Sequence, residues 1–380
     1  YLTIDEVSKI TGDNIETLRK RCQATKITGA SLKGKTWLIP RSYIFKVNIT
    51  KPPIPLLWLD TWVILRLAKA VKSSSATKEE KSWGEDIFER IASLTDKKKI
   101  LCPEADQGLE IETGGRLVDE ARELQAQISR GITVHYHHAV EELQIQRVMN
   151  GYVNKKSEVT LPWKDLFFED PIRELEKKSP YIVTVQSNPP KKELEERKKT
   201  NRSIADDWEA IRQEAIKKRE RYDVRLQLEL AGRGNLIMKV AALLVAKRIH
   251  KKEVSTDELI RAMNIMGKPL SWWERDGKQA EDFFGLIQFY LSEEFKKIPT
   301  IDISSSLVSK LVTDHEKIRP SDIMDVNQIS AILPYAHYMV LDGPMRDKII
   351  YKLKLGEKYQ TQILRLKELP DLLDKLRVGK

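Results

Sequence analysis

Residues 56–60, Leu-Leu-Trp-Leu-Asp, form an apolar run that ends in a carboxylate, and residues 338–342, Tyr-Met-Val-Leu-Asp, repeat this pattern much later in the sequence. A strand that is buried on both faces of a parallel sheet is apolar throughout, and ligands of open α/β sheets gather where the strands end. We therefore predict an α/β fold, a parallel sheet flanked by helices, with Asp60 and Asp342 on one edge of the sheet. The alternative for either residue taken singly is a helix cap.

A third acid is expected from the segment that follows a predicted short strand at residues 99–103. A helix beginning near the end of this strand would bring Glu110 back over the same edge. The spacing leaves Asp106 and Glu112 as alternatives for this position.

A fourth acid is expected from a helix that starts near residue 320. Asp325 is predicted to face the cleft, and Asp322, its neighbour one turn away, is expected to join it as a metal ligand. Four converging carboxylates repel one another unless a cation neutralises them. Oxygen ligands without clustered Cys or His favour Mg²⁺ or Mn²⁺ over zinc, and such a metal can activate water against a phosphodiester.

The order of these motifs resembles that of PIN-domain nucleases. "LLWLDTWVILRLA" is similar to that family's first strand and acid, "ILCPEADQGLE" to its second, and "PSDIMDVNQISAILPYAHYMVLDGPMRD" to its third and fourth. The resemblance implies a PIN-like sheet and metal-dependent cleavage of RNA, less often DNA. It assigns the catalytic and metal-binding roles to Asp60, Glu110, Asp325 and Asp342, with Asp347 as a possible aid where Gly343 and Pro344 depart from the pattern.

The first 43 residues read as a separate module. Residues 3–6 form a capping box for a short helix that stops at Gly12, and a second helix starts after Asn14. With the turn at 33–35 and the segment "TWLIPR", this arrangement resembles the winged helix-turn-helix of excisionase and MerR-type proteins. Residues 1–50 hold nine Lys and Arg against four Asp and Glu, a surplus that suits phosphate contacts. The residues expected to bind nucleic acid are Arg19, Lys20, Arg21, Lys33, Lys35 and Arg41. A protein partner for this module is the alternative.

The pattern of the whole chain predicts the following organisation: a winged module at 1–45, a proline-bearing linker at 46–55, a first core part at 56–152, a helical insertion at 153–300 and a second core part at 301–380. Residues 190–230 are dense in charges of both signs and predict a long solvated helix or a mobile arm, which could also dock a protein partner.

The composition indicates which partners, which redox compartment and which kinds of site this chain can be expected to have. The formal net charge is +10, which suits a polyanionic partner without establishing one. Cys22 and Cys102 stand alone in apolar segments, so neither a disulfide framework nor a zinc site is expected, and a reducing cytoplasm fits. We find no apolar run long enough to span a membrane.

Two other features are assigned structural roles. Residues 135–138, His-Tyr-His-His, are expected to lie on a strand, where alternation allows at most two of the histidines to share a site. Trp272 and Trp273 could stack on bases, but helix packing is the favoured interpretation.

Our principal hypothesis is therefore a cytoplasmic endonuclease that depends on Mg²⁺ or Mn²⁺, serving as a toxin-like or phage-defence effector. The alternatives are a DNA-binding regulator, or a subunit of an assembly, in which the PIN-like core is a scaffold without catalysis.

Overall fold

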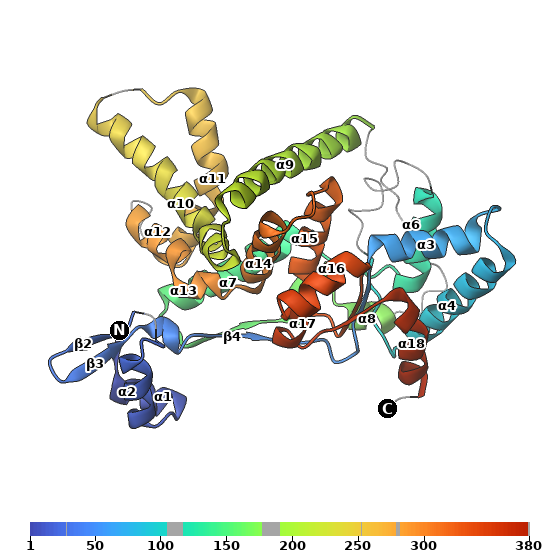
Figure 1. The fold of residues 1–380 in the computed structure, drawn as a ribbon, viewed down its shortest axis with the longest axis horizontal. Coiled ribbons are helices and arrows are strands. Elements are labelled where there is room, and N and C mark those ends of the chain that lie inside the picture. The colour runs from blue at the N-terminus through green and yellow to red at the C-terminus, as the bar shows by residue number, and fades with distance from the viewer. Residues whose placement is uncertain (28, 105–116, 177–190, 252, 279–281, 379–380) are drawn as a thin grey trace. The chain divides into compact units, whose positions relative to one another are not determined.

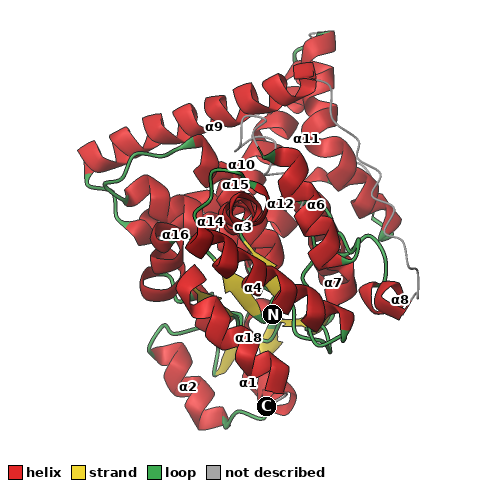
Figure 2. Ribbon diagram, turned by 90° about the vertical axis from the view of Figure 1, so that its right-hand side faces the viewer, coloured by secondary structure: helices red, strands yellow, loops and turns green. Residues whose placement is uncertain are grey.

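The structure is a computed structural model that describes residues 1–27, 29–104, 117–176, 191–251, 253–278 and 282–378. It is mixed α/β and mostly helical, with short strands (Figures 1 and 2), which confirms the predicted α/β class. The chain forms two compact units. Unit 1 comprises Tyr1–Asn48, Gln144–Leu161 and Leu230–Ile298, and unit 2 comprises Ile49–Leu143, Pro162–Glu229 and Pro299–Lys380.

The boundaries of these two units differ from the boundaries of the segments predicted from the sequence. The predicted linker at 46–55 spans the change from unit 1 to unit 2. The predicted insertion at 153–300 is shared between the units, because residues 162–229 belong to the unit that carries the parallel sheet.

The parallel sheet of unit 2 has the order β5-β7-β8, formed by β5 (Leu57–Leu59), β7 (Tyr338–Val340) and β8 (Gln362–Leu364). Parallel bridges from Leu56 to Leu101 and from Glu104 to Thr133 continue the pairing beyond β5. The two apolar runs that end in Asp are therefore neighbouring parallel strands. The Leu56 N–H donates to His337 Nδ1 across 281 residues of sequence.

Helices cover both faces of this sheet. Leu57, Leu59 and Val340 pack into one hydrophobic cluster, and Trp58 and Met339 pack into another, as the two-residue alternation of strands requires. The first cluster is completed by α3 (Thr61–Lys72), α4 (Lys78–Asp96), α6 (Val118–Ser129) and α18 (Leu369–Val378). The second is completed by α9 (Lys191–Lys218), α14 (Pro299–Thr313) and α15 (Pro320–Ile332) (Figure 1).

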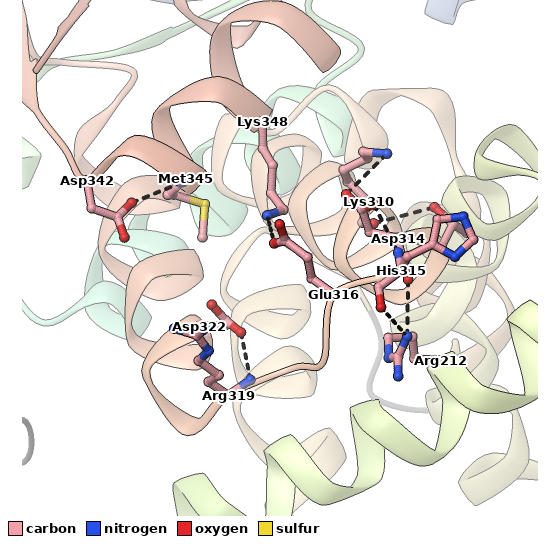
Figure 3. Close-up of polar contacts among 11 residues, drawn as sticks. Arg212, Lys310, Asp314, His315, Glu316, Arg319, Asp322, Asp342, Met345 and Lys348 are labelled. Atoms are coloured by element: carbon pink, nitrogen blue, oxygen red, sulfur yellow. Dashed lines mark hydrogen bonds and ion pairs between the residues drawn. The ribbon is translucent and has the colours of Figure 1, made fainter.

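The charged segment predicted as a solvated helix or mobile arm is helical over α9, but it is not solvated all round. Ala205 and Ala215 are buried in the second cluster, and Trp208 packs against it. Arg212 of α9 donates to the carbonyl oxygens of Asp314 and His315 after α14 (Figure 3). The apolar positions are few, yet their helical spacing suffices to attach one face of α9 to unit 2.

The N-terminal part of unit 1 contains two short helices and a three-stranded antiparallel sheet of order β1-β3-β2. Its elements are β1 (Leu2–Thr3), α1 (Ile4–Thr11), α2 (Ile15–Gln23), β2 (Ser31–Lys33) and β3 (Thr36–Ile39). The predicted capping box is present, since Thr3 Oγ1 accepts from the Glu6 N–H and the Glu6 carboxylate accepts from the Thr3 N–H. Val7, Leu18 and Ile39 form the centre of a small core.

The rest of unit 1 is mainly helical. It contains β4 (Lys46–Ile49) paired with β6 (Glu158–Leu161), most of α7 (His137–Val153) and of α10 (Tyr222–Ile249), and α11 (Thr256–Arg275), α12 (Phe283–Leu291) and α13 (Glu293–Lys296). Trp272 and Trp273 are buried in α11, which supports the packing interpretation.

Short elements complete unit 2. They are the 3-10 turns at Trp163–Leu166 and Leu366–Glu368, α8 (Pro171–Glu176), α16 (Gly343–Asp347), a π-helical turn at Lys348–Lys352 and α17 (Leu355–Lys358). Unit 1 also has a 3-10 turn, at Arg41–Tyr43. The strand predicted at 135–138 is wrong: only Thr133 and Val134 form bridges, and α7 already begins at His137.

Candidate metal centre

Asp60 lies at the junction of β5 and α3, at the carboxyl end of its strand. Its backbone N–H donates to the Val340 carbonyl oxygen at 3.1 Å, and its carbonyl oxygen accepts from the Val63 N–H at 2.8 Å. The residue is only 9% exposed. Strand pairing therefore fixes a buried carboxylate at this edge of the sheet.

Asp342 holds the corresponding position after β7. Its Oδ1 accepts from the Met345 N–H at 3.0 Å and caps α16 (Figure 3). The helix-cap alternative thus holds for Asp342. A cap occupies only part of the acceptor capacity of a carboxylate, because its two oxygens together offer about four lone-pair sites. Asp342 can therefore cap α16 and bind a ligand at the same time.

The two carboxylates interact electrostatically. Burial is the main cause that raises the pKa of Asp60 to about 6, and the negative charge of Asp342 raises it further. The backbone N–H groups of Thr61, Asp342 and Trp62 lower this pKa and offset only part of the rise. A buried carboxylate beside a second one is costly to ionise in the absence of a positive charge. The pair has the oxygen-donor chemistry that a hard divalent cation requires.

The pair also lies where the order of the strands reverses. On one side of β5 the sheet continues to Leu101 and then to Thr133, while on the other side it continues to β7 and β8. Chain segments that leave neighbouring strands in opposite directions open a crevice at the carboxyl edge, and this is where open α/β sheets bind ligands. Asp60 and Asp342 flank this switch point.

Asp322 approaches the pair from the first turn of α15. Its carboxylate accepts from the Arg319 N–H at 2.7 Å (Figure 3). Burial raises the pKa of Asp322, the charge of Asp342 raises it slightly, and Lys348 and Arg319 act in the opposite direction. Lys348 itself is buried and pairs with Glu316 at 2.8 Å. The edge of the sheet therefore combines acids with a basic side chain, Lys348, that is itself held in an ion pair.

Of the other predicted acids, Asp325 is described by the structure and Glu110 is not. Asp325 lies on α15, half-buried, one turn after Asp322. Glu110 and its alternatives Asp106 and Glu112 lie outside the described residues. Over the ranges that the structure describes, no three His, Cys, Asp or Glu side chains converge closely enough to hold a metal ion.

Asp347, considered as an aid to the metal, is engaged in ion pairs. Its Oδ1 lies 3.3 Å from Arg346 and 3.4 Å from Arg365. Arg365 directly follows β8 and its side chain is 43% exposed. The two guanidinium groups place positive charge beside the carboxyl edge, where a phosphate would need it.

Glu104 is an acid that the sequence reasoning did not single out. It bridges to Thr133, is 9% exposed and lines a cavity of about 210 Å³ together with His135, His137 and Gln328. Burial lowers the pKa of both histidines, which favours their neutral forms. The available signal was its position directly after Cys102-Pro103, where the strand ends.

The basic residues predicted for nucleic-acid binding fall into two groups. Arg21 donates to Asp13 and to the Tyr43 hydroxyl, both at 2.9 Å, and Arg41 donates to the Lys155 carbonyl oxygen at 2.9 Å. These two guanidinium groups are therefore held within unit 1. Arg41 is nevertheless exposed, as are Arg19, which pairs with Glu16 at 3.5 Å, and Lys20, Lys33 and Lys35.

No family model, no curated protein and no solved structure matches this chain. None of the helices that the structure describes combines the length and apolar character needed to cross a membrane.

Proposed function

We propose that unit 2 is a metal-dependent nuclease of the PIN-domain type. The observation that carries this proposal is the pair Asp60 and Asp342, two carboxylates that leave neighbouring parallel strands at the switch point of the sheet. The resemblance of the flanking motifs to PIN-domain nucleases supports the same choice and favours RNA over DNA. Glu110, Asp325 and Asp322 remain the predicted further ligands.

Asp60 and Asp342 would hold Mg²⁺ or Mn²⁺, the cations that oxygen donors select. The bound cation would supply an activated water and charge neutralisation for phosphodiester hydrolysis. The residues of the chain would orient the two metal-binding carboxylates and neutralise charge on the substrate phosphate. Strand pairing holds the Asp60 backbone, the Met345 N–H orients Asp342, and exposed Arg365 offers a positive charge to the substrate phosphate.

The test is cleavage of labelled single-stranded RNA, single-stranded DNA and duplex DNA by the full chain with Mn²⁺, Mg²⁺ or EDTA. The Asp60→Asn/Asp342→Asn double variant should lose metal-dependent cutting. Asp371→Asn, which removes the same kind of charge from an exposed position on α18, should retain it. Equal cutting by the double variant, or no cutting by the native chain under any of these conditions, would refute the proposal.

A second function, nucleic-acid docking by the N-terminal module, is favoured by the exposed Lys20, Lys33 and Lys35. Each phosphate contact that is removed should reduce the slope of log affinity against log salt by about one. Lys33→Ala/Lys35→Ala should therefore weaken duplex binding by the full chain and flatten its salt dependence. An unchanged slope would leave a protein partner as the better assignment for the module.

A further inference from the structure

A groove in unit 2 lies along α3 from Trp62 to Ala70, faces the first turns of α4 and also includes Leu117 in its lining. It has a volume of about 790 Å³. Its walls carry two tryptophans, two basic residues and two acidic residues, namely Trp62, Arg66, Lys69, Glu79, Glu80 and Trp83. The nuclease proposed above uses none of them.

The α3 wall is aromatic and basic. Trp62, Arg66 and Lys69 recur at helical spacing and so share one face of α3, which contains no acidic residue. Trp62 is 41% exposed, whereas burial is the usual state of a ring of this size. It lies two residues after Asp60, so this face begins within one helical turn of the proposed metal centre.

The Arg66 guanidinium contacts both indole rings of the groove. Its guanidinium carbon is 5.6 Å from the centroid of the Trp62 ring and 5.7 Å from that of the Trp83 ring. These two cation–π contacts link the rings of Trp62 and Trp83 through one charged side chain. In the described part of the chain Arg66 forms no ion pair, so its charge is available to a ligand.

The two helices are held close together at this point. A Cβ atom on Gly84 would lie 2.6 Å from the Ala70 Cβ, a distance that only glycine permits. Trp83 immediately precedes this contact, which fixes the distance between the aromatic walls (Figure 1 shows α3 beside α4). The groove is thus built by backbone packing as well as by flexible side chains.

We propose that this groove binds the unpaired bases of a single-stranded nucleic acid, a ligand whose identity rests on the proposed nuclease function. A flat base can stack on the open face of Trp62, and only unpaired bases expose such a face, because duplex bases stack on each other. Arg66 and Lys69 suit the adjoining phosphates. On the opposite wall, Glu79 and Glu80 repel phosphate. Glu80 already accepts from the Thr77 N–H in the capping box of α4, so Glu79 is the acceptor for a base amino group, and this charge pattern fits a strand whose bases face into the groove.

The test measures binding by the full chain in EDTA, where metal-dependent cutting is blocked. The probes are a fluorescein-labelled oligo(A) RNA of about twelve nucleotides and a duplex of the same length, followed by anisotropy. Trp62→Leu should weaken single-strand binding roughly tenfold or more, which is the usual effect of losing one stacked base. Trp62→Phe, which keeps an aromatic face, should retain most of the affinity.

The controls separate stacking from other effects. Phe284→Leu removes a ring that is 71% exposed on α12 of unit 1 and should leave single-strand binding unchanged. Duplex affinity should not respond to Trp62→Leu. Native-like single-strand binding by both Trp62→Leu and Trp83→Leu, or equal losses for single strand and duplex, would overturn the inference.

The two proposals fail in different ways. If the native chain cuts with Mn²⁺ but Trp62→Leu binds and cuts like the native chain, the groove inference fails and the nuclease stands. If the native chain cuts nothing but Trp62→Leu loses single-strand binding, the groove stands as a binding site and the nuclease fails.

Discussion

Replacing Asp60 by Asn should stabilise the metal-free protein at neutral pH. The pKa of Asp60 is raised from 3.8 to about 6 by burial and by Asp342. At about 1.4 kcal/mol per pH unit, ionising Asp60 costs the folded protein roughly 3 kcal/mol. The residue is 9% exposed, so solvent screens little of this cost. The new amide group also needs a hydrogen-bond partner, which reduces the expected net gain to about 1–3 kcal/mol.

The pH dependence has a definite sign. Because its folded-state pKa is raised, Asp60 holds its proton more tightly in the folded protein than in the unfolded chain. The stability that this proton contributes is fully present below pH 3.8 and is lost as the pH rises through about 6. The native protein should therefore lose up to about 3 kcal/mol over this window, and Asp60→Asn should lack this loss.

The assay is urea denaturation in EDTA, followed by circular dichroism at several pH values between about 4.5 and 8. Asp371→Asn, at an exposed position on α18, controls for the change in net charge. The reasoning is refuted if Asp60→Asn is no more stable than the native protein near pH 7.5 and loses stability over the same pH window.

Three further predictions concern the metal, the groove and the N-terminal module. Mn²⁺ should raise the melting temperature of the native chain, and Asp342→Asn should abolish most of that rise in a thermal-shift titration, because one of the two paired acids is gone. Gly84→Val should cost about 1–3 kcal/mol in urea denaturation, because its side chain overlaps Ala70; an unchanged midpoint would mean that α3 and α4 are not in close contact. Arg21→Ala should lower the melting temperature more than Lys20→Ala, because only Arg21 joins Asp13 to Tyr43; equal effects would contradict this role.

The sequence predicts the centre of unit 2 well because that centre depends on local patterns. An unbroken apolar run such as residues 56–59 has few structures available other than a doubly buried strand. Once two such runs are parallel neighbours, the Asp that follows each must emerge at the same edge. Given that the two strands pair, the adjacency of Asp60 and Asp342 follows from strand polarity.

What depends on long-range partners could not be predicted. The helical face that carries Arg21 is readable from the sequence, but its pairing with Tyr43 is set by how the module folds back on itself. Similarly, the few apolar residues of α9, such as Trp208, do not reveal that they pack against unit 2. The strand predicted at residues 135–138 was wrong because α7 starts at His137 without a Ser, Thr, Asp or Asn cap to signal it.

The sequence separation inside the sheet has a consequence for synthesis in the cell. The strand that carries Asp60 pairs with a segment 281 residues further along the chain. At about 5–20 residues per second, a ribosome needs roughly 15–55 s to produce the second strand after the first. During this interval the β7-facing edge of β5 has no native partner, and the two acids cannot meet. The growing chain therefore carries an unpaired apolar strand until β7 has been made, and the proposed metal centre can form only after that.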